Sequence, residues 1–239
     1  MHRFYAPQIA STLTLPEDES RHCVKVLRMA EGDLIEVVDG AGTLYTCRIA
    51  LAHAKRCAVE VVSSQSAPPH WGHKVVIGIS PTKSVDRIEW MAEKCTEMGV
   101  DRIVPLLCRN SERRVLKTER VQKILVAAMK QSLKAQLPRL DELTPLGQLI
   151  AEPFSGDRFI AYIDPSLPRE KRVNLAQAYR PGRDTMVLIG PEGDFDPDEV
   201  QAALAAGFVP VSLGESRLRT ETAATFACAL CHALDMAAK

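Results

Sequence analysis

The chain lacks several features that would assign it quickly to a common class of protein. No apolar run reaches the ~18–20 residues of a membrane-spanning helix, and Met1 is not followed by the apolar core of a signal peptide. No Gly-x-Gly-x-x-Gly occurs, and no glycine-rich turn leads into the Lys-Ser/Thr pair of a phosphate-binding loop. We therefore expect a cytoplasmic protein without a membrane partner and without a common nucleotide-binding fold.

The sequence also lacks a clear motif for a metal site or a redox site. The seven cysteines are an odd number without regular spacing, which favours reduced, buried thiols. Cys228–His232 has the spacing of a haem-attachment motif, but it lies in an apolar helical segment, and no second ligand cluster accompanies it. The histidines show no Ser-His-Asp spacing. We expect no metal.

The charges are balanced overall but unevenly distributed. The 239 residues carry a formal net charge of zero. Residues 74–139 nevertheless hold 14 Lys and Arg against 7 Asp and Glu, whereas residues 140–239 hold 9 against 15. A basic face on a neutral protein can bind a phosphate backbone, although a solvated helix surface explains the same charges equally well.

Hydrophobic patterning predicts two domains, at residues 1–70 and 71–239. In the first, the runs Asp33–Asp39 and Thr43–Ile49 flank a Gly40–Gly42 turn, as in a hairpin, and a small β-barrel fits. Residues 66–70 read as a linker. In the second, strands alternate with helices, which predicts a parallel sheet covered by helices. The expected strands are His73–Ser80, Arg102–Leu107, Phe159–Ile163, Thr185–Ile189 and Phe208–Leu213.

Helix ends are also marked. Ser84 and Gly99 bracket one expected helix, and Thr118–Gln136 is a long basic one. The run from Asp196 to Glu199 has an Asp cap, Pro at the first position and Glu at the third, and Gly207 closes that helix. A last apolar helix runs from Glu221 to Met236, with Thr220 as a candidate cap.

The most informative feature is a pair of glycine-bearing segments, Val187–Phe195 and Ser212–Ala224. In each, an apolar strand-like run breaks into a glycine turn that feeds a helix. Ligand sites in α/β proteins lie at such strand ends, and a helix start offers N–H donors and a positive dipole. Either turn alone is explained by local conformation. Together, we expect them to form one pocket.

These segments resemble the RsmE family of SPOUT methyltransferases. Arg21–Asp33, the hairpin Asp39–Gly42 and Lys94–Pro105 are similar to further signatures of that family, so the resemblance covers nearly the full length. It implies methyl transfer from S-adenosylmethionine (SAM) to N3 of a uridine in small-subunit (16S) ribosomal RNA. It also implies an α/β fold, in which a PUA-like β-barrel precedes a SPOUT domain with a deep trefoil knot, and a homodimer.

The resemblance also implies which residues hold SAM, mostly through backbone groups. The matching positions are Leu188, Ile189, Gly190, Pro191, Gly193, Leu213, Gly214 and Leu218. Methyl transfer from a sulfonium needs positioning rather than a metal. Uridine N3 must lose its proton, so the site needs a base or a cation that stabilises the uridinate. We expect Arg219 to be the cation, and Glu192 or Glu221 to accept the proton or orient Arg219. A structural role suits either Glu equally well.

Contacts to RNA are expected from the basic stretch between Arg109 and Arg139 and from exposed cations elsewhere. Many relatives carry Arg where this chain has Lys134, which keeps the charge but loses the planar fork. Solvated surface is the competing interpretation of the N-terminal cations and of Lys83. The candidates are Arg3, Arg28, Lys83, Arg109, Arg113, Arg114, Gln131 and Lys134.

Other functions compete with this one. The same fold serves methyltransferases that act on tRNA or on another rRNA position. A ribosome-assembly factor that binds RNA without turnover is a different class, against which the intact glycine segments speak. The sequence does not decide whether naked rRNA or the assembled small ribosomal subunit is the substrate, nor which residue takes the proton.

Overall fold

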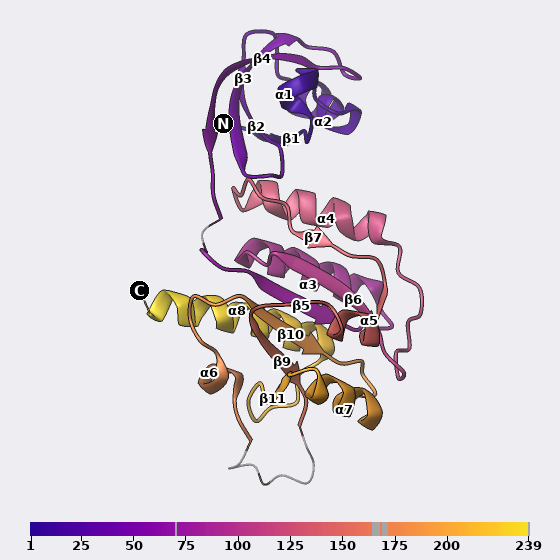
Figure 1. Ribbon diagram of the computed structural model, residues 1–239. Coiled ribbons are helices and arrows are strands. Elements are labelled where there is room, and N and C mark those ends of the chain that lie inside the picture. The colour runs from indigo at the N-terminus through magenta and orange to yellow at the C-terminus, as the bar shows by residue number, and fades with distance from the viewer. Residues whose placement is uncertain (70, 164–167, 169–171, 239) are drawn as a thin grey trace. The chain divides into compact units, whose positions relative to one another are not determined.

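The computed structural model describes residues 1–69, 71–163, 168 and 172–238 (Figure 1). It contains two compact units. The first comprises residues 1–70 and 126–137, and the second comprises residues 71–125 and 138–239. The first break thus falls after residue 70, but the C-terminal half of helix α4 (Thr118–Gln131) groups with the first unit. The predicted division at 1–70 and 71–239 stays a prediction.

The first unit is built on a four-stranded sheet in the order β1-β2-β3-β4. β1 runs parallel to β2, and the other neighbours are antiparallel. The predicted hairpin is confirmed, because Asp39 Oδ1 accepts hydrogen bonds from the amides of Ala41 (2.8 Å) and Thr43 (3.0 Å) in the turn. β1 and β4 are the two outer strands of this order. The strands are β1 (Arg3–Tyr5), β2 (Leu34–Val38), β3 (Thr43–Leu51) and β4 (Ala58–Ser66).

Short helices and a second chain segment complete the first unit. Helices α1 (Ile9–Thr12) and α2 (Glu17–Arg21), with the π-turn η1 (His22–Val26), precede the hairpin. Met129 and Ala135 pack against Val38 in a small apolar cluster. Lys130 forms an ion pair with Glu19. Residues 126–137 therefore supply part of this unit's core and a partly buried ion pair.

The second unit contains an all-parallel sheet, as predicted. Its order is β11-β9-β10-β5-β6-β7, and β8 pairs with β6. Every residue of β5 and β10 is buried, which is typical of central parallel strands covered on both faces. The predicted bounds of β6 and β10 are confirmed. The strands are β5 (Val75–Ile79), β6 (Arg102–Leu107), β7 (Arg139–Leu140), β8 (Thr144–Pro145), β9 (Asp157–Ala161), β10 (Thr185–Ile189) and β11 (Val209–Val211).

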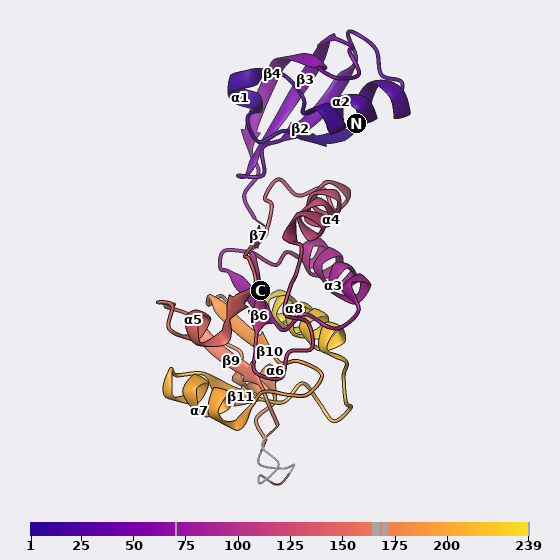
Figure 2. The same cartoon turned by 90° about the vertical axis from the view of Figure 1, so that its right-hand side faces the viewer.

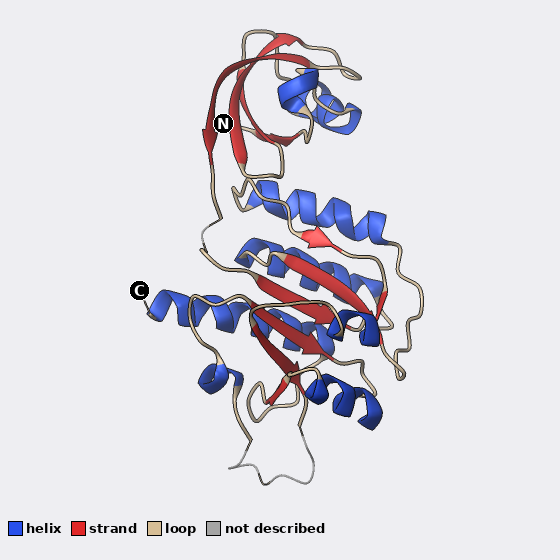
Figure 3. Ribbon diagram, in the orientation of Figure 1, coloured by secondary structure: helices blue, strands red, loops and turns tan. Residues whose placement is uncertain are grey.

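Helices cover both faces of this sheet (Figures 1 and 2). α3 (Val85–Met98) packs with α8 (Thr220–Ala237) on one face, and α5 (Leu146–Ile150) packs with α7 (Pro197–Ala205) on the other. Figure 3 shows the resulting helix–sheet–helix layering. In the described part of the chain, no helix is long and apolar enough to cross a membrane.

The helix ends agree with the prediction in two cases and differ from it in three. Asp196 Oδ1 accepts a hydrogen bond from the amide of Asp198 (3.0 Å) and Gly99 ends α3 with a φ of +105°, as predicted. Ser84 stands at the N-cap of α3, but its side chain makes no cap bond. The cap of α8 is Arg219 rather than Thr220. Helix α4 ends at Gln131 rather than Gln136, because Leu133 adopts a left-handed backbone (φ +58°).

The cysteines behave as core residues. All seven are free and buried, as predicted, and Cys228 and Cys231 are fully buried in α8. In the described residues, no group of three or more His, Cys, Asp or Glu could hold a metal ion. Burial, reinforced by the nearby Glu199 carboxylate, raises the pKa of Cys108 from its ordinary value of 9.0 to about 12.

We predict that Cys108 makes stability pH-dependent on the alkaline side. A thiol with a raised native pKa contributes stability in full below pH ~9, and this contribution is lost as pH rises from 9 toward 12, because only the unfolded chain has released its proton. The measurement is urea unfolding of wild type and of Cys108→Ala at pH 7.5 and 10.5. The difference between the two proteins in free energy of unfolding should be about 1–2 kcal/mol smaller at pH 10.5 than at pH 7.5. An equal gap at both pH values would contradict the prediction.

Candidate functional site

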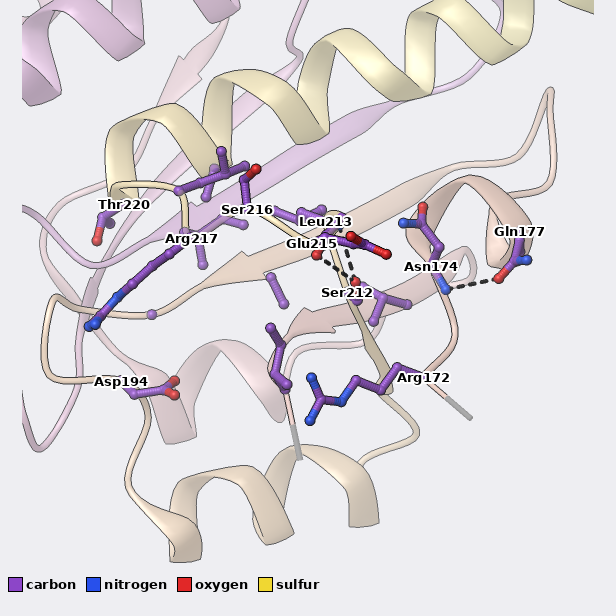
Figure 4. Close-up of a pocket in the computed structure, with 18 residues that line it drawn as sticks. Arg172, Asn174, Gln177, Asp194, Ser212, Leu213, Glu215, Ser216, Arg217 and Thr220 are labelled. Atoms are coloured by element: carbon purple, nitrogen blue, oxygen red, sulfur yellow. Dashed lines mark hydrogen bonds between the residues drawn. The ribbon is translucent and has the colours of Figure 1, made fainter. Parts of the chain in front are cut away.

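A cavity of about 730 Å³ opens at the carboxyl edge of the parallel sheet. Its inner wall is a row of three residues, because Ala161 at the end of β9 is in register with both Ile189 of β10 and Val211 of β11. The volume is in the range of small-molecule sites. The remaining lining residues are Ile163, Arg172, Asn174, Gln177, Gly190, Asp194, Ser212, Leu213, Gly214, Glu215, Ser216, Arg217, Leu218, Thr220 and Ala223 (Figure 4).

The two glycine turns line this same cavity, although their strands are not neighbours. β9 lies between β10 and β11 in the sheet, so the turn after β10 and the turn after β11 approach from its two sides. At Gly190 an added Cβ would lie 3.0 Å from the ring of Phe195, a tight contact that the buried ring would have to relieve by a small shift. Gly214 is needed for conformation, because its φ is +115°.

Five of the eight positions expected to hold a cofactor line the cavity: Ile189, Gly190, Leu213, Gly214 and Leu218. The other three lie outside the lining. Leu188 is fully buried in the core cluster that includes residues of α5 and α7, because successive strand residues point to opposite faces. Pro191 is buried, and Gly193 is exposed and lies against Asn110. A cofactor contact by any of the eight stays a prediction.

A third loop, which the sequence reasoning missed, supplies Arg172, Asn174 and Gln177 to the wall. The loop pairs with the turn after β11, because the amide of Leu175 donates to the carbonyl of Ser212 (2.9 Å). It contains no glycine, so a search for glycine turns overlooks it. Its available signal is the Asn-x-x-Gln pattern of a capping box, which Asn174 and Gln177 form at the start of α6 (Leu175–Ala178).

The charged side chains of the wall balance one another. Asp194 and Glu215 are acidic, and Arg172 and Arg217 are basic. A polyphosphate site would concentrate cations instead. The mixture suits a ligand that carries both signs of charge.

Arg219 and Glu221 stand at the start of α8, where Thr220 and Ala223 line the cavity. Arg219 is exposed and makes no ion pair with the described residues. Glu221 is only 7% exposed; its Oε1 lies 3.7 Å from Nε of Arg87, and its Oε2 has no hydrogen-bond partner in the described chain. The ion-pair partner of the Glu221 carboxylate is thus Arg87 of α3, a residue that the sequence analysis did not predict.

Glu192 lies on the other turn and is exposed. Its Oε1 accepts a hydrogen bond from the amide of Lys83 (3.1 Å), which ties the turn after β10 to the loop after β5. Neither Glu192 nor Glu221 is paired with Arg219 in the described structure. The catalytic roles of all three residues stay predictions.

Four of the RNA candidates lie together on the loops after β5 and β6. The Arg113 guanidinium donates to the carbonyls of Thr82 (3.1 Å) and Lys83, so this side chain holds the β5 loop. Arg109 pairs with Asp196 (2.6 Å) and Asp198 (3.1 Å). The Lys83 ammonium is exposed and lies 3.9 Å from the carboxylate of Glu112, and Arg114 donates to the carbonyl of Arg109 (3.0 Å).

The other four RNA candidates belong to the first unit. Arg3 is held by two hydrogen bonds from its guanidinium to Glu36 Oε2 (2.9 and 2.7 Å) and is largely covered. Arg28 is exposed and has a left-handed backbone with a φ of +56°. Gln131 is exposed at the end of α4, and Lys134 is half-buried. The eight candidates are thus divided between the two units, four in each, and their contact with RNA stays a prediction.

Asn110 holds the turn after β10 from outside the cavity. Its Nδ2 donates to the carbonyls of Gly193 (3.4 Å) and Asp194 (3.1 Å). The amide of the preceding residue, Arg109, donates to Glu199 Oε1 (2.8 Å) on α7. The basic loop after β6 thus fixes one wall of the cavity. No glycine or catalytic-motif signal marked this asparagine.

Comparison with known families identifies the class of protein. Residues 69–232 match the model of an RNA methyltransferase domain, and residues 15–62 match the model of an RNA methyltransferase PUA domain. These matches agree with the β-sheet unit and the parallel α/β unit described above. The fold is that of an RNA methyltransferase with an N-terminal PUA domain.

Individual relatives narrow this class. The chain is 32% identical to a ribosomal RNA small subunit methyltransferase E from Synechocystis, over 95% of this chain and 74% of the relative. A probable rRNA methyltransferase from Porphyromonas gingivalis has a similar crystal structure (44% identity, TM-score 0.94, all of both chains). So does a ribosomal RNA small subunit methyltransferase E from Neisseria gonorrhoeae, solved bound to SAM (27% identity, TM-score 0.83, 98% of each chain). The chain belongs to the RsmE family of 16S rRNA methyltransferases.

We predict that Asn110→Ala loosens the turn after β10. Two hydrogen bonds are lost, so we expect stability to fall by about 1 kcal/mol and amide hydrogen exchange to accelerate at residues 193–195. Exchange in α3 should stay unchanged. Glu112→Ala, in the same loop and exposed, is the control and should leave both measurements as in wild type. Unchanged exchange at Asp194 in the Asn110 variant would contradict this role.

Proposed function

We propose that this chain transfers the methyl group of SAM to N3 of a uridine in 16S rRNA, in the cytoplasm. One observation carries the proposal: a cavity walled by two glycine turns lies beside an exposed, unpaired arginine of the described chain, Arg219. Membership of the RsmE family and the SAM-bound relative support it. Binding of SAM to the purified chain, measured by calorimetry, is the first test.

The cavity fits SAM in size and in chemistry. Ile189, Leu213 and Leu218 supply apolar surface of the kind that accepts an adenine ring, and the main chain at Gly190 and Gly214 is bare. The mixed charges of the wall suit a ligand with both an amino-acid group and a cationic centre. When bound, SAM would supply a methyl group carried on a sulfonium. Loss of that methyl group converts the sulfonium into a neutral thioether.

The chain's own task is to handle the charge and the proton of the uridine. N3 attacks only after its proton has left, and the resulting negative charge needs a cation beside it. Arg219 supplies that cation, because no carboxylate of the described chain neutralises it. Glu221 is the better placed proton acceptor, since its Oε2 makes no hydrogen bond within the described part of the chain and the adjacent Thr220 lines the cavity. Glu192 then has the structural role of joining two loops.

Finer features of the fold follow from the same family membership. We propose that residues 71–239 form a SPOUT domain with a deep trefoil knot and that residues 1–70 form a PUA-like barrel. The knot rests on membership of the RsmE family. We also propose a homodimer, which acts on 16S rRNA or on the small ribosomal subunit.

Arg219→Ala should abolish turnover while leaving the affinity for SAM within about twofold of wild type. Removal of one group that stabilises transition-state charge costs about 100-fold or more in rate. The assay is mass mapping of N3-methyluridine in small-subunit rRNA from a deletion strain, incubated with SAM and each enzyme. Arg219→Lys is the conservative control and should retain partial turnover, since it keeps the charge. Near-normal turnover of Arg219→Ala would refute the assignment.

RNA binding should weaken steeply with salt, because phosphate contacts release counterions. Lys83→Ala and Arg114→Ala should each reduce the slope of log affinity against log salt by about one. Arg109→Ala should change it less, because Asp196 and Asp198 already pair with that guanidinium. The measurement is a titration of labelled rRNA at several salt concentrations. An affinity indifferent to salt would count against RNA as the substrate.

A further inference from the structure

Asp194 is an unusual residue on the cavity wall. It lies in the turn between β10 and α7, and its φ of +64° places it in the left-handed region. Asp adopts this conformation more readily than most residues, but glycine adopts it with the least strain, and such strain tends to collect at functional sites. The turn already uses glycine at 190 and 193. An aspartate at 194 therefore retains a side chain where a third glycine would fit with less strain.

The main chain of Asp194 is engaged within the protein. Its amide donates to the carbonyl of Pro191 (2.9 Å). Its carbonyl accepts from Asn110 Nδ2 (3.1 Å). Both polar backbone groups are thus occupied, and the carboxylate is the polar group that Asp194 presents to a ligand.

The carboxylate itself is held in place by one oxygen and leaves the other open. Oδ1 accepts a hydrogen bond from the amide of Phe195 (2.8 Å). Oδ2 makes no hydrogen bond or ion pair with the described chain, Arg217 included. Figure 4 shows Asp194 on the side of the cavity opposite Asn174 and Gln177. This is a fixed acceptor oriented before any ligand binds, the arrangement that reduces the entropic cost of recognition.

The second acidic residue of the wall offers a comparison. Glu215 is exposed on the turn after β11, and its carboxylate makes no hydrogen bond with the described residues. It carries the same charge as Asp194 without the contacts that fix it. Glu215 therefore distinguishes the effect of a fixed contact from the effect of general negative charge in the cavity.

We propose that Asp194 recognises the cofactor, with its open carboxylate oxygen accepting a positively charged group of the ligand. The inference rests on the proposed function. SAM carries two such groups, the sulfonium and the α-ammonium, whereas the demethylated product S-adenosylhomocysteine (SAH) carries only the ammonium. A contact with the sulfonium would also favour release of the product, because transfer of the methyl group removes the charge that Asp194 attracts.

Calorimetric titration of Asp194→Asn with SAM and with SAH tests the proposal. Asn retains an Oδ1 acceptor for the amide of Phe195 and tolerates the left-handed backbone, so only the charge is removed. We expect the affinity for SAM to fall about tenfold, because an attraction between opposite charges is lost. SAH weakens in parallel if the ammonium is the partner and is unaffected if the sulfonium is. Unchanged affinity for SAM would overturn the proposal.

Two further variants separate a fixed contact from general charge and from misfolding. Glu215→Gln removes the other acidic charge of the wall and should weaken SAM binding less than Asp194→Asn does; an equal loss would indicate a diffuse field and overturn the proposal. Asp194→Gly removes the carboxylate and also the strain of the left-handed backbone, so it should bind SAM as weakly as Asp194→Asn does. It therefore tests the proposal even if Asp194→Asn folds poorly. Binding of SAM to wild type tests the proposed function separately. If it fails to bind SAM, the proposed function itself is wrong, whereas loss confined to the variants concerns Asp194.

Discussion

The pairing of β9 with both β10 and β11 is the constraint on which the site depends. Parallel strands in register end at one edge, so Ala161, Ile189 and Val211 form a row. Each strand then releases its loop at that edge, and three loops from distant parts of the sequence surround one space. A strand inserted between the two glycine turns holds them apart by the width of one strand. That separation creates a cavity where adjacent strands would have placed the turns in contact.

The basic loop after β6 links this cavity to the surface expected to face RNA. Its main chain and its Asn110 side chain hold the turn after β10, while Arg113 holds the loop after β5. Some of its charge is already used within the protein, since Arg109 pairs with two carboxylates of α7. A phosphate must displace such partners before it gains the cation, so paired arginines contribute less to binding than unpaired ones. Charge counted along the sequence therefore overstates the charge offered to a nucleic acid.

Local chemistry explains which features were predictable. The parallel sheet followed from alternating strands and helices, and the start of α7 followed from Asp196 and Glu199. The end of α4 was mispredicted, because Leu133 takes a left-handed conformation that its side chain does not favour. Five positions that the family resemblance implied for cofactor binding line the cavity, and two of them are the glycines of the turns, Gly190 and Gly214. The loop around Asn174 contains no glycine turn that would mark it in the sequence, and its place on the wall comes from the backbone hydrogen bond between Leu175 and Ser212.

The sequence by itself determined the glycine turns, the start of α7 and the family, because each depends on residues close together in the chain or on motifs in a recognisable order. Only the tertiary structure decided which loops share the cavity and which charges are already paired. Asn110 meets Asp194, and Arg87 meets Glu221, across long stretches of sequence. Such contacts are set by the order of strands in the sheet and by the packing of α3 against α8, and no spacing along the chain encodes them.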